Sequence, residues 1–175
     1  IFPAAPAHSL LLRKATGELP HGGGVRFTKD SKHYALLFDW IAAGAPRTPA
    51  DAPKIVRVLV EPAGLSLAPN EQVSVKAIAE YSDGRLRDVT DGAAFQSNDK
   101  TIVNALPEGV LQAGPLAGET AVMVRYMNHI AVCGVTIPLP GAVPDEAYTS
   151  LPRKNAIDEL VWQKLKLLGI LPSAP

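Results

Sequence analysis

The sequence predicts a mainly β protein: an antiparallel β-sandwich of about seven strands with short α-helices at both ends. Across residues 53–139, apolar and polar residues alternate with a period of two in short segments, as in strands with one buried face. On either side, apolar residues recur with helical spacing, and proline-rich stretches mark both boundaries. We therefore expect a helical segment with a linker at 1–52, the sandwich at 53–139, and a linker and helix at 140–175.

The N-terminal segment is expected to hold two short helices. We expect Ser9 to cap the first helix, which runs through Ala15. We expect Ser31 to cap the second helix, which ends near Gly44. The glycines at 22–24 predict a loop between them, because three consecutive glycines cost too much backbone entropy in a helix. The apolar face of the second helix is Tyr34, Leu37, Phe38 and Ile41. Two helices of this size make a thin core.

The strands begin after the linker. Val56, Val58 and Val60 alternate with Arg57, Leu59 and Glu61, and Pro62 ends this strand. The clearest strand is Gln72–Tyr81, and Gly84 supplies the positive φ of the turn after it. Further strands are expected at 95–97, 102–105, 110–113, 120–126 and 130–137.

Seven short strands in 87 residues, with no helix between them, are typical of an immunoglobulin-like (Ig-like) sandwich. A small barrel is the alternative fold. In the sandwich, we expect these side chains to be buried between two sheets: Val58, Val75, Ala77, Phe95, Val124 and Val135.

The last helix is expected to run from the cap Asn155 to Leu168, with Gly169 after it. Its apolar stripe is Ile157, Leu160, Val161, Leu165 and Leu168. A stripe this wide needs a covering surface, so we expect the helix to pack against the sandwich or the N-terminal helices.

Composition excludes several classes of protein. Lys+Arg and Asp+Glu both count 17, so the basic excess of a nucleic-acid binder is missing. The apolar stretches are too short or too interrupted for a membrane span. The first residues, Ile1–Pro6, show neither an initiator Met nor the charged leader and apolar run of a signal peptide. We therefore expect the sequence to begin inside a longer protein.

No complete catalytic site is evident, and we predict that the chain is not an enzyme. None of the histidines lies in a Gly-x-Ser-x-Gly or His-Glu-x-x-His context; they are His8, His21, His33 and His129. Cys133, the single cysteine, is expected to be a small buried hydrophobe, and it excludes a Cys-x-x-Cys-His haem attachment within this chain.

Four aspartates at turns could in principle collect calcium at one end of the sandwich: Asp83, Asp88, Asp91 and Asp99. Their spacing matches no calcium loop. Aspartate also favours turns because its carboxylate accepts hydrogen bonds from its own backbone. We therefore expect turn formation and no metal site.

The central strings resemble the second group of bacterial Ig-like domains, known from surface adhesins of the invasin and intimin type. Residues 81–90 read Tyr-Ser-Asp-Gly-Arg-Leu-Arg-Asp-Val-Thr and residues 95–99 read Phe-Gln-Ser-Asn-Asp. Gly118-Glu119 and Val124-Arg125-Tyr126 complete the match, which covers about half of the chain.

Both flanks resemble parts of large planctomycete secreted proteins. The tail of the cytochrome c-like domain in those proteins is similar to residues 6–12, 17–24 and 40–46. In those proteins an uncharacterised domain follows the Ig-like module, and the opening of that domain is similar to residues 155–173. The resemblance implies export from the cytoplasm. It also implies haem c in the full-length protein. Related cytochrome domains carry Met-Pro-Pro for the second axial ligand, where this chain has Leu19-Pro20-His21. Leucine cannot ligate iron and imidazole can, so His21 is the candidate axial ligand.

The expected function is a non-catalytic spacer or interaction module of a multidomain extracytoplasmic protein, whose partners are neighbouring domains of the same polypeptide. Two alternatives remain open. One is an electron-transfer segment with haem contacts from residues 1–46. The other is adhesion to protein or carbohydrate at the cell surface, which the fold allows.

Overall fold

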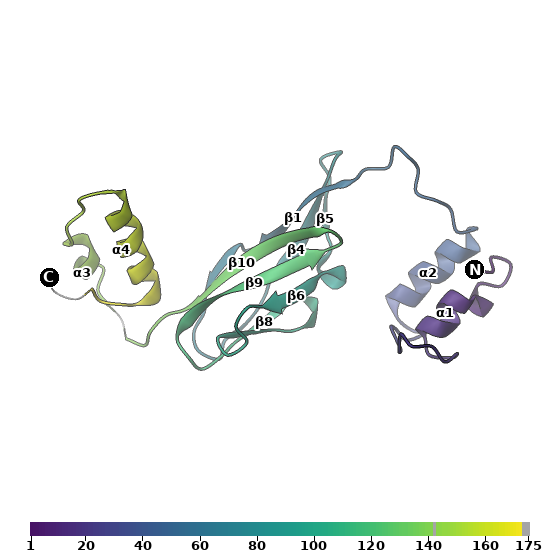
Figure 1. Ribbon diagram of the computed structural model, residues 1–175, viewed down its shortest axis with the longest axis horizontal. Helices are drawn as coiled ribbons and strands as arrows, with labels where there is room; N and C mark the ends of the chain where they lie inside the picture. The colour runs from purple at the N-terminus through teal and green to yellow at the C-terminus, as the bar shows by residue number, and fades with distance from the viewer. Residues whose placement is uncertain (142, 173–175) are drawn as a thin grey trace. The chain divides into compact units, whose positions relative to one another are not determined.

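The computed structural model describes residues 1–141 and 143–172, and the chain divides into two compact units, Ile1–Ala52 and Pro53–Pro175 (Figure 1). The first unit holds a 3-10 turn (Pro6–His8), α1 (Leu10–Ala15) and α2 (Lys32–Ala42). Its centre is formed by the fully buried side chains of Leu12 and Ile41. No helix in the described part of the chain is long and apolar enough to cross a membrane.

The two predicted serine caps have different outcomes. The hydroxyl of Ser31 accepts a hydrogen bond from the Tyr34 N–H at 3.2 Å, as a capping serine does. Ser9 precedes α1 but makes no capping bond with its side chain. Its buried hydroxyl instead accepts the N–H of Phe2 at 2.8 Å, which ties the first residues of the chain to the start of α1.

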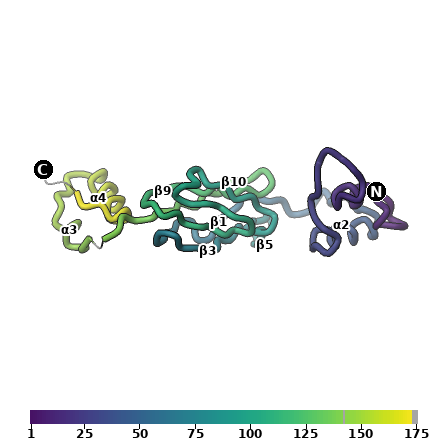
Figure 2. Tube along the Cα trace, turned by 90° about the horizontal axis from the view of Figure 1, so that it is seen from below, coloured from purple at the N-terminus to yellow at the C-terminus, as the bar shows by residue number. Residues whose placement is uncertain are grey.

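The second unit contains the predicted β-sandwich. A four-stranded sheet has the order β2 (Gly64–Ser66), β10 (His129–Ile137), β9 (Gly118–Tyr126), β6 (Ala94–Ser97). A three-stranded sheet is formed by β1 (Ile55–Glu61), β4 (Lys76–Tyr81) and β5 (Leu86–Asp88), and another by β3 (Gln72–Ser74), β8 (Val110–Ala113) and β7 (Val103–Ala105). Figure 2 shows the sandwich from below.

The described residues form ten strands where about seven were expected. The predicted strand Gln72–Tyr81 is split at Val75, whose N–H donates to the Gly109 carbonyl at 2.9 Å, so that β3 and β4 pair with different partners. The other additional strands, β2 and β5, have three residues each. Segments this short carry no periodicity that a sequence can reveal.

The core lies where the alternation predicted it. Val58, Val75, Ala77, Val124 and Val135 are buried, and Phe95 is half-buried against them. Val56, which the alternation puts on the same face as Val58 and Val60, departs from it, since its side chain is 55 % exposed. A register shift between Ile55 and Arg57 interrupts the pairing of β1 with β4, and this bulge turns Val56 out of the alternation.

One pairing in the sandwich is parallel. β1 leads through Pro62 and Ala63 into β2, which pairs in parallel with the last strand: Gly64, Leu65 and Ser66 lie opposite Gly134, Val135 and Thr136. Because β2 and β10 run in the same direction, the chain enters the sandwich at one pole and leaves it at the other. We call the pole with residues 54, 82–85 and 127–128 proximal, and the pole with residues 67–69 and 137–139 distal.

The C-terminal segment contains α3 (Glu146–Thr149) and α4 (Ala156–Leu168). Asn155 and Asp158 form a capping box at the start of α4, and Gly169 ends it with φ 67°. Both features agree with the sequence pattern.

The predicted packing of the α4 stripe is only partly correct. Ile157, Leu160 and Val161 are exposed, whereas Leu165 and Leu168 are half-buried. The end of the helix meets the sandwich, where the Leu168 carbonyl accepts the Leu139 N–H at 2.9 Å. Its other side faces the preceding segment: the Trp162 indole N–H donates to the Pro152 carbonyl at 3.0 Å. The buried Tyr148 closes this small assembly with a 3.2 Å hydrogen bond from its hydroxyl to the Ile170 carbonyl. These contacts leave the first half of the predicted stripe exposed and partly cover its second half.

Candidate functional site

The segment 81–90 forms a hairpin at the proximal pole. Its turn lies at Ser82–Arg85, where Gly84 has φ 80° as predicted. The Asp83 carboxylate accepts from the backbone N–H of Arg85 at 3.2 Å and from its guanidinium at 2.6 Å. Ser82 fixes the start of the sandwich, since its hydroxyl accepts the Lys54 N–H at 3.1 Å and its N–H donates to the Lys54 carbonyl.

The end of the same segment ties β5 to β4. The Asp88 carboxylate accepts from the Thr90 N–H at 3.0 Å and from the Thr90 hydroxyl at 2.6 Å. The Thr90 hydroxyl in turn accepts the N–H of Ala77 at 2.9 Å, and Val89 between them is buried in the core. The string Asp-Val-Thr therefore holds the end of β5 against β4.

The second string, 95–99, makes an equivalent connection. The Asp99 carboxylate accepts from the Thr101 N–H at 2.8 Å and the Thr101 hydroxyl at 2.6 Å. The Asp99 N–H donates to the hydroxyls of Ser97, at 3.2 Å, and Thr120, at 3.1 Å. These bonds anchor the loop between β6 and β7 to β9. The polar residues of the two strings that make these bonds thus stabilise the fold.

These bonds also define the role of the turn aspartates. The carboxylates of Asp83, Asp88 and Asp99 are engaged by neighbouring N–H and side-chain groups, as expected of turn formers. Asp91 has a partner as well. Within residues 1–141 and 143–172, no three His, Cys, Asp or Glu side chains gather where they could hold a metal ion.

The hydrogen-bonded carboxylates of Asp88 and Asp99 make the stability of the fold depend on pH. Hydrogen bonds, first from the Thr90 side chain and then from its N–H, lower the pKa of Asp88 below 3.8, and the Thr101 side chain and N–H do the same for the pKa of Asp99. A lowered folded-state pKa means that the unfolded chain takes up protons first. The stabilisation is present above pH 3.8 and is lost as the pH falls through the lowered values.

We therefore expect the free energy of unfolding, measured in urea, to decline as the pH is lowered from about 5 to about 2. The double variant Asp88→Asn, Asp99→Asn should show a shallower decline. If the unfolding free energy of the variant fell with pH as steeply as that of the wild type, the two carboxylates would have no role in acid stability.

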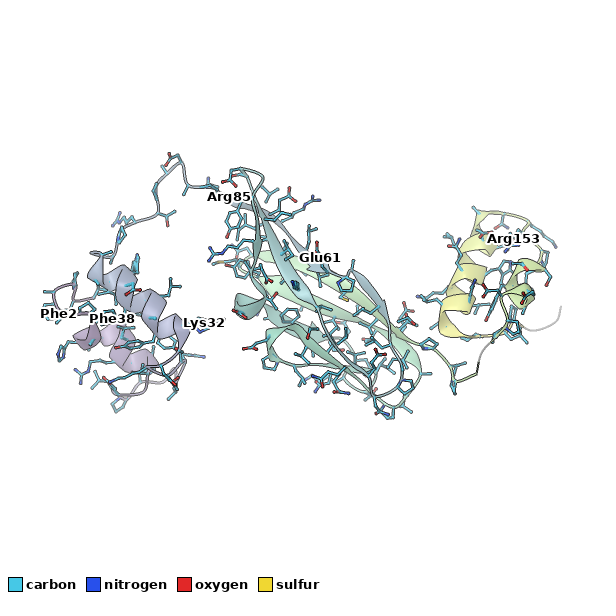
Figure 3. The ribbon with its side chains drawn as sticks, turned by 180° about the vertical axis from the view of Figure 1, so that it is seen from behind. Phe2, Lys32, Phe38, Glu61, Arg85 and Arg153 are labelled. Carbon is cyan, nitrogen blue, oxygen red and sulfur yellow. The ribbon has the colours of Figure 1, made fainter. Side chains whose placement is uncertain are left out.

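The side chains of three other hairpin residues lie outside the Asp-Thr bonds that tie the sheet together. Arg85, Leu86 and Arg87 are exposed, and they line a groove of about 360 Å³ together with Pro53 and Tyr81. Figure 3 labels Arg85 near the end of the sandwich. Sequence reasoning missed this groove. The one signal for it was the Arg-Leu-Arg run, which interrupts the turn-forming residues of the string.

His21 lies on the exposed loop between α1 and α2, where its imidazole sits over the backbone of Gly23. The residues of the chain do not by themselves fit a haem c site, because the two thioether cysteines are missing. The single cysteine, Cys133, is buried in the sandwich core, where burial raises the pKa of its thiol. The axial role of His21 stays a prediction that concerns a longer protein.

The chain has only weak similarity to known proteins. No protein family and no curated protein matches the sequence. Among solved structures, domains 4 and 5 of the S-layer protein SbsC match 49 % of this chain at 17 % identity, with a TM-score of 0.41. A longer SbsC structure matches 57 % of the chain at 18 % identity, with a TM-score of 0.44. The adhesin InvE of Yersinia pseudotuberculosis matches 46 % at 15 % identity, with a TM-score of 0.29.

The matches span 53 %, 15 % and 25 % of those three structures respectively. Likeness at this level carries no argument about function. The case for a function therefore rests on the geometry of the sandwich.

Proposed function

We propose that the sandwich at residues 53–139 is a non-catalytic spacer and interaction module of a multidomain extracytoplasmic protein. The observation that carries this proposal is the parallel pairing of β2 with β10, which separates the points where the chain enters and leaves. A strand rises about 3.3 Å per residue, so the nine residues of β10 alone span about 30 Å. Domains attached at residues 53 and 139 would be held apart by this length.

The interior of the sandwich suits a rigid spacer. Its buried core is aliphatic apart from Cys133, and the described buried side-chain nitrogen and oxygen atoms all have hydrogen-bond partners. Such a core needs no ligand or metal to fold. The neighbouring domains of the same polypeptide are the partners that we propose. The resemblance of residues 81–90 and 95–99 to bacterial surface modules supports the extracytoplasmic location.

The arrangement of the terminal strands also fits a module that carries tension. Force applied between residues 54 and 139 pulls β2 and β10 in opposite directions along their length. Their bonds include Leu67 N–H to the Thr136 carbonyl and Gly134 N–H to the Ala63 carbonyl, both 2.9 Å. Bonds between strands run across the direction of pull, so all of them must be strained together before the strands separate.

We expect single-molecule unfolding of the Lys54→Cys, Leu139→Cys variant to require more force than unfolding of the Asp83→Cys, Asn128→Cys variant. The second pair lies in two turns at the proximal pole, from which the strands can be peeled apart one bond at a time. Cys133 is buried and leaves the introduced thiols as the attachment points. Equal unfolding forces in the two geometries would contradict a spacer built to carry tension.

A further inference from the structure

The groove at the proximal pole lies against an open sheet edge. β5 is the last strand of the order β1-β4-β5. Its bonds to β4 include Tyr81 N–H to the Arg85 carbonyl and Val89 N–H to the Ala77 carbonyl, so residues 85, 87 and 89 face β4 with their backbone groups. By the alternation of an antiparallel ladder, the N–H and C=O of Leu86 point outward. They are available to another strand.

The side chains beside this edge combine positive charge with apolar surface. Arg85, Arg87 and Tyr81 project from one face of the hairpin, because cross-strand partners and residues two apart share a face. Leu86, 63 % exposed, and Pro53 add apolar surface to the groove. The volume of about 360 Å³ falls in the range of binding pockets and suits a short segment of ligand.

The two guanidinium groups differ in their present contacts. Arg85 is held by Asp83, in an exposed ion pair of the kind that contributes little to stability, so an incoming carboxylate can replace Asp83. Within the described residues, the guanidinium of Arg87 has no hydrogen-bond or ion-pair partner. A charged edge discourages pairing with neutral or basic strands, and an acidic strand would be the complementary one.

We propose that this groove binds an extended acidic peptide segment, which adds as a strand to the open edge of β5. Two carboxylates two residues apart in such a segment lie about 7 Å from one another on one face. The two carboxylates would meet Arg85 and Arg87 on one face, while the peptide backbone bonds to Leu86 and the apolar side chain between the carboxylates lies beside Leu86 on the other face. This gives the module a partner-binding site in addition to its spacing role.

The test uses the full chain and a labelled peptide, acetyl-Thr-Glu-Val-Glu-Thr-amide, titrated by fluorescence anisotropy. The proposal predicts saturable binding, weakened about tenfold or more when both Glu are replaced by Gln in the peptide, since charged hydrogen bonds are lost. Arg87→Gln should weaken binding by a similar factor. Asp83→Asn should strengthen it, because Arg85 is released. Both substitutions are at exposed positions, and an unchanged thermal midpoint verifies folding.

Strand addition is tested separately by methylating the peptide backbone nitrogens that would face Leu86, which should abolish binding. Failure of the acidic peptide to bind, equal binding of the Gln peptide, or an unchanged affinity of Arg87→Gln would overturn the proposal. So would full affinity of the methylated peptide. Tighter binding of an oligogalacturonate than of the peptide would also overturn it, and would show that the groove takes an acidic saccharide.

Discussion

Replacing Gly109 with alanine is expected to lower the free energy of unfolding by about 3–4 kcal/mol, the combined cost of a left-handed residue and an overpacked contact. Gly109 has φ 75°, and a Cβ placed on it would lie 2.2 Å from the carbonyl oxygen of Val75. The same atom would come within 3.0 Å of Thr90 Cγ2 and 3.3 Å of Phe95 Cζ. Because the obstructing oxygen belongs to the backbone, relief requires the break between β3 and β4 to move.

Gly84→Ala is the matched control for this prediction. Gly84 has nearly the same φ, 80°, but a Cβ there would have no atom within 4 Å. Its substitution should cost about 1 kcal/mol, the backbone term alone. Urea unfolding of the two variants separates the steric contact from the backbone conformation. Equal losses in the two variants would show that the contact with Val75 is not formed.

The second large effect is expected from Leu111→Ala, at about 2–5 kcal/mol. Leu111 is fully buried in β8, where it belongs to the core shared by the sheets. Truncation removes apolar contacts and leaves a cavity that the surrounding strands cannot fill. Leu116→Ala is the control, since Leu116 is 58 % exposed and its loss should change stability by less than about 0.5 kcal/mol. A loss below 1 kcal/mol for Leu111→Ala, by thermal or urea unfolding, would contradict its place in the core.

The parts of the fold that could be predicted are those whose signal is local. The alternation from Gln72 to Tyr81 correctly assigned the buried face of β3 and β4, and the capping residues at Asn155 and Gly169 correctly bounded α4. The turn at Gly84 follows from the conformational freedom of glycine alone. Each of these features depends on residues close together in the sequence.

The parts that could not be predicted depend on pairing between distant residues. The bulge that exposes Val56 arises from the register of β1 against β4, and β2 exists only because β10 lies beside it. The groove at the proximal pole brings Pro53 next to Tyr81, 28 residues along the chain, as a consequence of the same register. The turn aspartates were predictable because their bonding partners, such as Thr90 and Thr101, lie two residues away.

As a spacer, the sandwich must hold its two attachment points at opposite poles. Spin labels at Lys54→Cys and Leu139→Cys report this separation directly by double electron–electron resonance, and the buried Cys133 stays unlabelled. With strands rising about 3.3 Å per residue, the structure predicts a single distance between about 30 and 50 Å. A distance below about 20 Å would place both attachment points at the same pole and contradict the spacer function.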